Sequence, residues 1–296
     1  MAASSDSQPV PSTGSSPSPE PASAADVHPS RTPDRGRYAR AFGAVADAYE
    51  RARPTYPADA VAWATGRGRL RLLELGAGTG KLTGSLLAAG HDVLATEPDA
   101  GMLRRLRERH PQLATVRAAA EQLPVAGRSV DVVLAAQAAH WFDHERVLAE
   151  VARVLRPGGS VVWMWNIMDT RIPWVRRLRE LIASPAEVPP EPLEALGASE
   201  LFGEVERATF RFWQPLDRDS LAALVQSNSV VATMPEAQRA EVLERADALY
   251  DDYGRGPDGM LLPYLTHCFR ATVRDPGPAE DEPDPLGTDA LLIDFR

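Results

Sequence analysis

The amino-acid sequence predicts an α/β fold built on a mostly parallel sheet. Apolar runs of strand length alternate with longer segments of helical period, which is the pattern of strands joined by crossover helices. One of these runs, at residues 71–75, leads directly into a Gly-x-Gly-x-Gly turn at 76–80 and then into a helical segment. The composition of the 296 residues, 44% hydrophobic and 25% charged, is that of a chain with a substantial core. We therefore expect one large α/β domain with a ligand-binding turn.

Five strands are expected in the first half of this domain, and helices follow most of them. The strands lie at residues 70–75, 92–96, 113–116, 130–135 and 160–166. The clearest helix begins after Asp143, a good N-cap residue, and ends at Pro157-Gly158-Gly159. Its apolar face is made by Val147, Leu148, Val151, Val154 and Leu155.

The pattern changes after residue 166. A helix at 174–182 and a proline-rich loop lead to a strand of alternating pattern at 205–213. Two helices near 221–226 and 235–253 follow, and a last strand is expected at 261–271.

Both ends of the chain have compositions that are typical of disorder. Residues 1–35 are rich in Ser and Pro, and residues 276–296 are rich in acidic residues, so the folded domain is expected at 36–275. The apolar segment 290–295 either frays or docks on the domain, and both alternatives stay open. The first tail has four acidic and two basic residues, and the second has six and one. Most of the net charge of −9 therefore belongs to the tails.

Several classes of protein are not expected. No apolar run reaches the roughly 18 residues that a membrane helix needs, and the N-terminus lacks the pattern of a secretory signal, which favours a cytoplasmic protein. The single cysteine, Cys268, excludes an intramolecular disulfide and a multi-cysteine metal site. His140, Asp143 and His144 lie close in sequence, but no further histidine or cysteine motif supports them, so no metal is expected.

The glycine turn at 76–80 is the most informative segment. Glycines let the backbone turn sharply and approach a ligand, and a nucleoside cofactor is the natural occupant of such a turn after a parallel strand. A phosphate-binding Walker loop is excluded, because Leu75 and Leu82 occupy the positions that need Gly and Ser/Thr. A dinucleotide turn is weakened, because Lys81 replaces its third glycine. Glu97, at the end of the second strand, suits the ribose of either kind of adenosine cofactor.

Five motifs in order along the chain resemble those of class I S-adenosylmethionine-dependent methyltransferases. They read E-L-G-A-G-T-G at 74–80, T-E-P at 96–98, A-E-Q-L-P at 120–124, D-V-V-L at 131–134 and L-R-P-G-G at 155–159. The resemblance covers about residues 40 to 271. Phe42-Gly43, Tyr49, R-P-T-Y-P at 53–57 and Q-A-A-H-W-F-D at 137–143 are similar to the small-molecule branch that includes trans-aconitate methyltransferase-like proteins.

The resemblance implies a Rossmann-like sheet of seven strands with an antiparallel last strand and helices on both faces. It also implies S-adenosylmethionine as the cofactor. The residues that it assigns to cofactor binding are Arg53, Glu74, Gly76, Ala77, Gly78, Thr79, Gly80, Glu97, Pro98, Met102, Ala120, Glu121, Ala136 and Gln137. Ala119 departs from the family, in which an Asp often accepts from the adenine amino group at this position.

A small aromatic or amphipathic acceptor is expected, because aromatic side chains gather on the substrate side. The candidate substrate residues are Phe42, Tyr49, Trp141, Trp165, Asn166 and Trp174, and the substrate lid is expected from segments 36–57, 167–203 and 217–259. Trp163 and Trp165 alternate onto one face of their strand, so either can instead belong to the core. A nucleic-acid substrate is not favoured, since the fourth strand ends in A-A-Q-A-A rather than the Asp/Asn-Pro-Pro-aromatic signature of amino-methylating DNA enzymes. The oligomeric state cannot be deduced.

His140 is the candidate catalytic residue. It falls just after the fourth strand, and imidazole titrates near neutral pH, so it suits a general base. The alternative, a histidine that only shapes the pocket, stays open. Two other functions also stay open: an NAD(P)-dependent oxidoreductase, and a cofactor-binding protein that has lost catalysis and acts through partners.

Overall fold

The computed structural model describes residues 53–185, 187–254, 256 and 259–274. The two predicted tails, most of segment 36–57, and the candidate residues Phe42 and Tyr49 lie outside the described residues. Segment 290–295 lies outside them as well.

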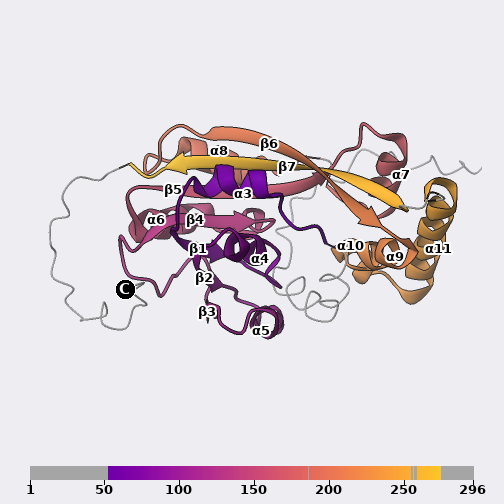
Figure 1. Ribbon diagram of the computed structural model, residues 1–296, viewed down its shortest axis with the longest axis horizontal. Coiled ribbons are helices and arrows are strands. Elements are labelled where there is room, and N and C mark those ends of the chain that lie inside the picture. Colours follow the sequence, from indigo (N-terminus) through magenta and orange to yellow (C-terminus); the bar gives the residue numbers. More distant parts are fainter. Residues whose placement is uncertain (1–52, 186, 255, 257–258, 275–296) are drawn as a thin grey trace, which may run out of the picture. The chain divides into compact units, whose positions relative to one another are not determined.

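The described residues form a seven-stranded sheet of order β3-β2-β1-β4-β5-β7-β6 (Figure 1). Its strands are β1 Arg71–Leu75, β2 Asp92–Thr96, β3 Ala114–Val116, β4 Val130–Ala136, β5 Leu155–Met168, β6 Glu206–Leu216 and β7 Met260–Thr272. The first five strands pair in parallel, and β7 pairs antiparallel with both β5 and β6. The Rossmann-like sheet with an antiparallel last strand is therefore confirmed.

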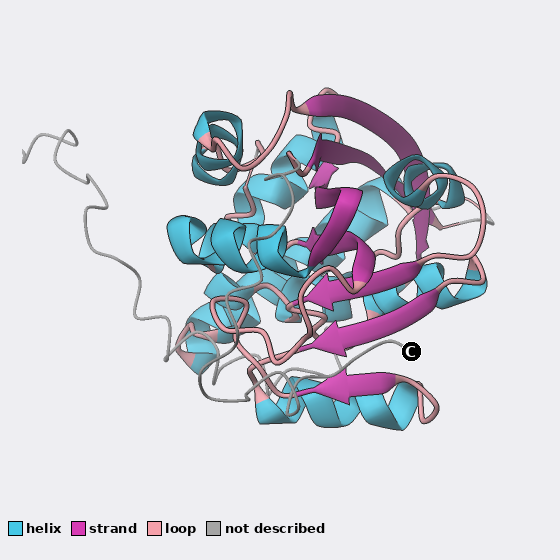
Figure 2. Ribbon diagram, turned by 90° about the vertical axis from the view of Figure 1, so that its left-hand side faces the viewer, coloured by secondary structure: helices cyan, strands magenta, loops and turns pink. Residues whose placement is uncertain are grey.

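Helices cover both faces of the sheet, as Figure 2 shows. Alternate residues of a strand point to opposite sides of the sheet. On one side, Leu72 packs with α3 (Ala58–Thr65) and α4 (Lys81–Ala88). On the other side, Leu73 packs with α6 (His144–Val154) and α8 (Glu191–Ala198). A smaller cluster joins α5 (Ala100–Arg109) to the β2 side of the sheet.

The helix α6 begins as the sequence predicts but ends earlier. The side chain of Asp143 accepts from the backbone amide of Arg146, and the predicted apolar face is buried. The helix stops at Val154, and β5 already begins at Leu155, which pairs with Val130. A Cβ on Gly159 would lie 2.9 Å from the Asp131 carbonyl oxygen. The first part of β5 therefore needs a glycine where its backbone passes close to that of β4.

A proline-rich segment that was expected as a loop contains a helix. The sequence prediction was wrong here, because α8 starts at Glu191 with a proline in its first turn, where the missing amide costs no hydrogen bond. Leu196 on this helix is fully buried in the cluster that includes α6. Burial of an apolar face, which the local composition does not reveal, stabilises the helix.

Four further helices pack together beside the ends of β6 and β7 (Figure 1). We call them the helical cap: α7 Pro173–Leu181, α9 Arg218–Gln226, α10 Ser229–Ala232 and α11 Glu236–Tyr253. The cap surrounds its own apolar cluster, which is separate from the clusters on the two faces of the sheet. In the described part of the chain, no helix has the length and apolar character to cross a membrane.

Candidate active site

The glycine turn follows β1 and requires glycine at three positions. Gly76, Gly78 and Gly80 have φ angles of +62°, +58° and +90°, in the left-handed region that side chains disfavour. A Cβ on Gly76 would lie 2.9 Å from Ala138 Cβ, and one on Gly80 would lie 2.6 Å from Leu106 Cδ1. A Cβ on Gly78 would meet no atom within 4 Å among the described residues. The backbone at Gly78 therefore faces open space that a ligand can enter.

Glu97 holds this turn from the end of the neighbouring strand. Its Oε2 accepts a hydrogen bond from the Gly78 amide at 2.9 Å, and its Oε1 accepts one from the Asp99 amide at 2.9 Å. The side chain is buried, and burial raises its pKa above the ordinary value. A carboxylate has about four lone-pair sites, so Glu97 keeps acceptor capacity for the hydroxyl groups of a ribose.

A buried carboxyl group lies beneath the turn. Glu74 is 2% exposed, and the Thr83 hydroxyl donates to its Oε2 at 2.5 Å. Burial raises the pKa of Glu74 to about 8, so the group is mostly protonated at neutral pH. The sequence analysis missed Thr83, although its place in the helix after the glycine turn was a possible signal.

Thr79 provides the clearest sign that the turn accepts a polar ligand. Its hydroxyl is buried and has no hydrogen-bond partner among the described residues. A buried polar group without a partner costs about 1–3 kcal/mol, and a bound ligand can remove this cost. Together with the open space at Gly78 and the fixed carboxylate of Glu97, this hydroxyl fits an adenosine-containing cofactor.

The other predicted cofactor residues lie in the loops that follow the strands. Asp99 caps α5 by accepting from the Met102 amide at 2.8 Å, and Met102 is buried. The Pro98 carbonyl accepts from Arg117. Ala120 and Ala77 are buried, and Ala136 is half-buried at the end of β4. Glu121 accepts from the Asp143 amide at 3.0 Å, which ties the loop after β3 to the start of α6.

The segment after β4 is fixed between the glycine turn and β5. Gln137 has a φ of +55°, an uncommon value for a residue with a side chain. Its Nε2 donates to the Asn166 carbonyl, and its amide donates to the Met164 carbonyl, both at 2.9 Å. Ala138 is the residue that the Cβ of Gly76 would contact. The short helix η1 (Ala139–Trp141) therefore starts directly beside the glycine turn.

His140 lies on η1 next to two tryptophans. The Trp165 indole Nε1 donates to His140 Nδ1 at 3.5 Å, and the rings of His140 and Trp141 have centroids 4.8 Å apart. Burial lowers the pKa of His140 to about 4, while Glu191 raises it and His144 lowers it. His140 is therefore a neutral imidazole at physiological pH.

Asn166 uses its side chain to hold other segments of the chain. It is buried, its Nδ2 donates to the Thr55 carbonyl at 3.2 Å, and its Oδ1 accepts from the Thr266 hydroxyl at 2.7 Å. Arg53 donates from Nη2 to the Ser227 carbonyl at 3.3 Å, so it links the start of the described chain to the turn between α9 and α10. The residues from 53 to 55 thus cross from the cap to the sheet.

The predicted substrate residues fall into two groups. Trp141, Trp165 and Asn166 lie at the ends of β4 and β5 with His140, and Trp165, like Trp163, belongs to the buried core. Trp174 packs in the cap, with its ring centroid 6.4 Å from that of Tyr253. Sequence analysis missed the stacked pair Phe212 and Tyr264 of the cap cluster, with ring centroids 5.3 Å apart.

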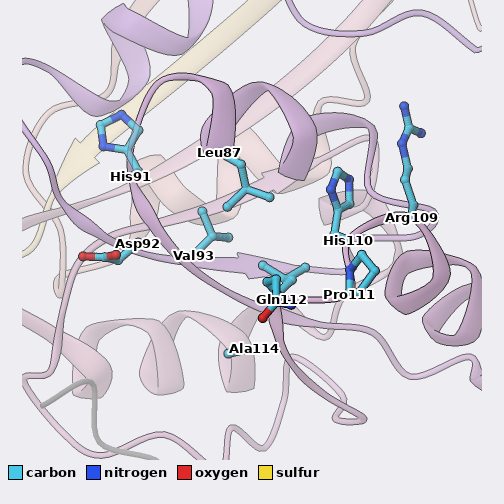
Figure 3. A pocket seen from close by; sticks show the side chains of 10 residues that line it. Leu87, His91, Asp92, Val93, Arg109, His110, Pro111, Gln112 and Ala114 are labelled. Atoms are coloured by element: carbon cyan, nitrogen blue, oxygen red, sulfur yellow. The ribbon is translucent and has the colours of Figure 1, made fainter.

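A hollow of about 690 Å³ lies at the start of β2 and borders the last residue of the glycine turn, because a Cβ on Gly80 would lie 3.1 Å from the ring of His110, which lines it. Figure 3 shows side chains that line this hollow, among them His91, Asp92 and His110. Asp92 begins β2, whereas Glu97 follows the last residue of that strand. Ligands of open parallel sheets bind at the carboxyl ends of strands, so the geometry at Glu97 is the better guide to the cofactor site.

Comparison with known proteins agrees with this geometry. A family model described as a methyltransferase domain matches residues 73–163. An uncharacterized methyltransferase of Mycobacterium tuberculosis is 41% identical over 235 residues, which are 78% of this chain and 95% of that protein. An uncharacterized methyltransferase-like protein of Schizosaccharomyces pombe is 31% identical over 236 residues, which are 76% and 92% of the two chains.

Two further matches concern one solved structure and one relative that matches over a shorter length. A structure described as a type II methyltransferase from Anaeromyxobacter dehalogenans has a TM-score of 0.55 and 26% identity, over 75% of this chain and 97% of that chain. A malonyl-[acyl-carrier protein] O-methyltransferase of Methylococcus capsulatus is 38% identical over 114 residues, 35% of this chain and 42% of that protein. With the glycine turn, Glu97 and the sheet topology, these relatives show that the chain belongs to the class I S-adenosylmethionine-dependent methyltransferases.

Proposed function

We propose that this methyltransferase acts on a small amphipathic or aromatic acceptor that enters between the glycine turn and the helical cap. The observation that carries the proposal is the cap cluster, an apolar core of its own that aromatic side chains border. Trp174, Phe212 and Tyr250 pack against this cluster and are only partly buried. An apolar body with a polar reacting group matches such a lining.

The cofactor end of the site is assigned to the glycine turn and Glu97. Gly76, Gly78 and Gly80 bring the backbone close to the ligand, Thr79 offers its hydroxyl, and Glu97 holds the ribose hydroxyl groups. When bound, S-adenosylmethionine would supply a methyl group on a sulfonium ion. The acceptor's lone pair would form the new bond to the methyl carbon, and the sulfur would keep the electrons of the broken bond as a neutral thioether. The protein's task is to align the two reactants and exclude water, which contributes on the order of 7–11 kcal/mol at most.

The remaining predicted residues take supporting roles in this proposal. Arg53 is assigned to the carboxylate of the cofactor, because its half-buried guanidinium lies on the segment that runs toward Asn166. Ala120 and Glu121 border the adenine, and Gln137 shapes the segment beside the reacting group. Trp141 and Trp174 form walls of the acceptor space, and Trp165 and Asn166 hold those walls in place.

A small molecule is preferred over a nucleic acid because of the residues after β4. The chain there carries Ala136, Gln137 and Ala138 rather than the motif of amino-methylating DNA enzymes. The similar Methylococcus protein is an O-methyltransferase, which supports an oxygen acceptor.

The experiment is a methyl-transfer assay with radiolabelled S-adenosylmethionine across a panel of small aromatic, amphipathic and hydrophilic acceptors. Methylation of amphipathic or aromatic members is the expected result. Tight binding of NAD(P) without binding of S-adenosylhomocysteine would indicate an oxidoreductase. Binding of S-adenosylhomocysteine without transfer to any acceptor would indicate a protein that has lost catalysis.

A further inference from the structure

The described residues leave one side of the edge strand β6 exposed. Arg207, Thr209, Arg211, Trp213 and Pro215 alternate onto this side, and all five are exposed. The residues between them are half-buried, because they point to the opposite side of the sheet. In Figure 1, β6 runs beside β7 toward the helical cap. We call these five side chains the β6 outer row.

The end of the β6 outer row near the helical cap is apolar. Trp213 is 54% exposed and Leu261 of β7 is 49% exposed, the two highest values among the large apolar side chains of the described residues. Trp213 pairs with Pro263, and Pro215 pairs with Leu261, so the two exposed side chains are diagonal neighbours on one side of the sheet. On the other side, the same part of the two strands carries the cap cluster. Exposed apolar side chains that adjoin in this way indicate a contact surface.

The other end of the β6 outer row is positively charged. The guanidinium of Arg207 lies 5.8 Å from the centre of the Phe269 ring, and no ion pair joins it to another described residue. Arg211 lies 3.8 Å from the carboxylate of Asp169, but Arg171 contacts the same carboxylate at 2.6 Å. Two guanidinium groups thus share one carboxylate, and a positive charge remains. The row therefore offers two cationic positions to an acidic partner.

The chain itself contains a segment of matching composition after β7. Residues 280–284 include four acidic residues, and residues 290–293 are apolar. Both groups lie outside the described residues. At the end of the described part, the Arg274 amide donates to the Leu201 carbonyl at 2.8 Å, and its Nε donates to the Phe202 carbonyl at 2.7 Å. The chain therefore leaves the sheet beside the loop that leads into β6.

The order of charged and apolar residues is the same in this segment and in the β6 outer row. Counted along the ladder with β7, Arg207 lies five residues from Arg274, Arg211 nine and Trp213 eleven. At about 3.3 Å per residue, these positions are about 17, 30 and 36 Å away. The acidic group follows Arg274 by six to ten residues, which extend over about 20–33 Å. The apolar group follows by sixteen residues, which extend to about 53 Å, so both groups reach their counterparts.

We propose that residues 280–293 lie along the β6 outer row, with the acidic group at Arg207 and Arg211 and the apolar group on Trp213 and Leu261. The contact braces the part of β6 and β7 that carries the cap cluster on its opposite side. A second copy of the chain and an unrelated protein are the alternative occupants, and the experiment separates them. Neither readout involves the cofactor, so the outcome is independent of the proposed function.

Disulfide formation between two introduced cysteines tests the contact in the full chain. Cys268→Ala first removes the natural cysteine. Leu261→Cys and Leu292→Cys then place one thiol on β7 and one in the apolar group. Leu87→Cys with Leu292→Cys is the matched control, because Leu87 is an exposed leucine on α4, next to the far edge of the sheet. In a glutathione redox buffer, we expect the first pair to show an effective concentration at least about tenfold above that of the control pair.

The products of this reaction separate the occupants. Equal effective concentrations for the two pairs would overturn the proposal. A disulfide between two chains, visible as a doubled mass on a non-reducing gel, would also overturn it, because the face would then belong to a second copy. Arg207→Gln combined with Arg211→Gln should lower the effective concentration several-fold, and so should about 0.5 M NaCl. An unchanged value in both conditions would contradict the role of the arginines.

Hydrogen exchange of the full chain gives a readout that needs no cysteine variant. Leu291→Asp combined with Ile293→Asp places two charges in the apolar group. We expect the backbone amides of β6 to exchange at least several-fold faster in this variant than in the unmodified chain, because the strand loses its cover. Thr288→Asp, which adds a charge outside the apolar group, is the control and should leave the exchange unchanged. Equal exchange of β6 in the double variant and the unmodified chain would overturn the proposal.

Discussion

The carboxylate of Glu97 accepts a hydrogen bond at 2.9 Å from the backbone amide of Gly78, so the end of β2 holds the turn that follows β1. The second oxygen of Glu97 accepts from the Asp99 amide at the N-cap of α5. One side chain thereby fixes the glycine turn and the next helix, while two lone-pair sites stay available for a ligand. This arrangement makes Glu97 and Gly78 the best places to test the cofactor site.

Glu97→Gln should weaken binding of S-adenosylhomocysteine by tenfold to about a hundredfold, because hydrogen bonds to a charged acceptor contribute about 1.5–3 kcal/mol. The amide has one oxygen, so its N–H group faces the backbone amide of either Gly78 or Asp99, and one of these two hydrogen bonds is lost. Calorimetric titration measures the change. Glu108→Gln, on the exposed face of α5, is the matched control and should leave the affinity unchanged. Equal affinities for the two variants would rule out a ligand contact at Glu97.

Gly78→Ala and Gly66→Ala form a second matched pair. Both glycines have positive φ, +58° and +80°, and a Cβ at either position meets no described atom within 4 Å. Each substitution should therefore cost about 1–2 kcal/mol of unfolding free energy from backbone strain alone. Only Gly78→Ala should also weaken cofactor binding, by at least tenfold, because its methyl group enters the space of the ligand. Chemical denaturation measures the unfolding free energy of both variants, and calorimetry measures their affinity for S-adenosylhomocysteine. Equal affinities of the two variants would contradict a ligand site at Gly78.

Glu74 predicts a pH dependence of stability. Its pKa is about 8 in the folded protein, above the ordinary value of 4.5, so its contribution is complete below pH 4.5 and is lost as the pH rises through 8. Between these limits the group lowers the unfolding free energy by up to about 1.4 kcal/mol per pH unit. Glu74→Gln removes this slope.

Urea denaturation at pH 5.5, 6.5 and 7.5 measures this effect. The stability of Glu74→Gln relative to the unmodified protein should increase from the lowest pH to the highest, because the amide cannot ionise. A difference that stays constant over this range would show that Glu74 is not protonated in the folded state. Glu108→Gln serves again as the exposed control.

Arg218 tests the role of the helical cap. It lies on α9, pairs with Asp247 and Asp251 of α11, and its guanidinium sits 5.0 Å from the centre of the Tyr250 ring. Arg218→Met should change the melting temperature little, since exposed ion pairs contribute little to stability. The KM for the acceptor should rise several-fold while the affinity for S-adenosylhomocysteine stays constant. Arg245→Met, at an exposed position of α11, is the control. An unchanged KM would show that the helical cap takes no part in binding the acceptor.

The sheet could be predicted closely from the sequence. The observed bounds of β1 to β4 differ from the predicted ones by one residue or less. For β1, β2 and β4 the reason is that short buried apolar runs leave little choice. The strand β5 is longer than predicted at both ends, since Leu155 at its start pairs with Val130 of β4 and its last residues pair with β7. The helix α8 was missed because its stability comes from Leu196, which packs in a distant cluster.

The site could be predicted only in part. Motif spacing located the glycine turn and Glu97, which the structure places within hydrogen-bond distance of each other. The spacing did not reveal that the side chain of Asn166 bonds to Thr55 and Thr266, because this depends on chain segments 111 and 100 residues away. Nor did it reveal that Trp165 contacts the imidazole of His140. Such contacts are tertiary, and they decide what a polar side chain can still do for a ligand.

Binding of S-adenosylmethionine by Glu97 and the turn at Gly76–Gly80 can be measured with the full chain. The measurement is a calorimetric titration with S-adenosylhomocysteine, run in parallel with one using NAD(P). We expect one S-adenosylhomocysteine to bind per chain, Glu97→Gln to weaken this binding by at least about tenfold, and NAD(P) to give no measurable heat. Binding of NAD(P) alone, or binding of S-adenosylhomocysteine that Glu97→Gln leaves unchanged, would contradict this cofactor site.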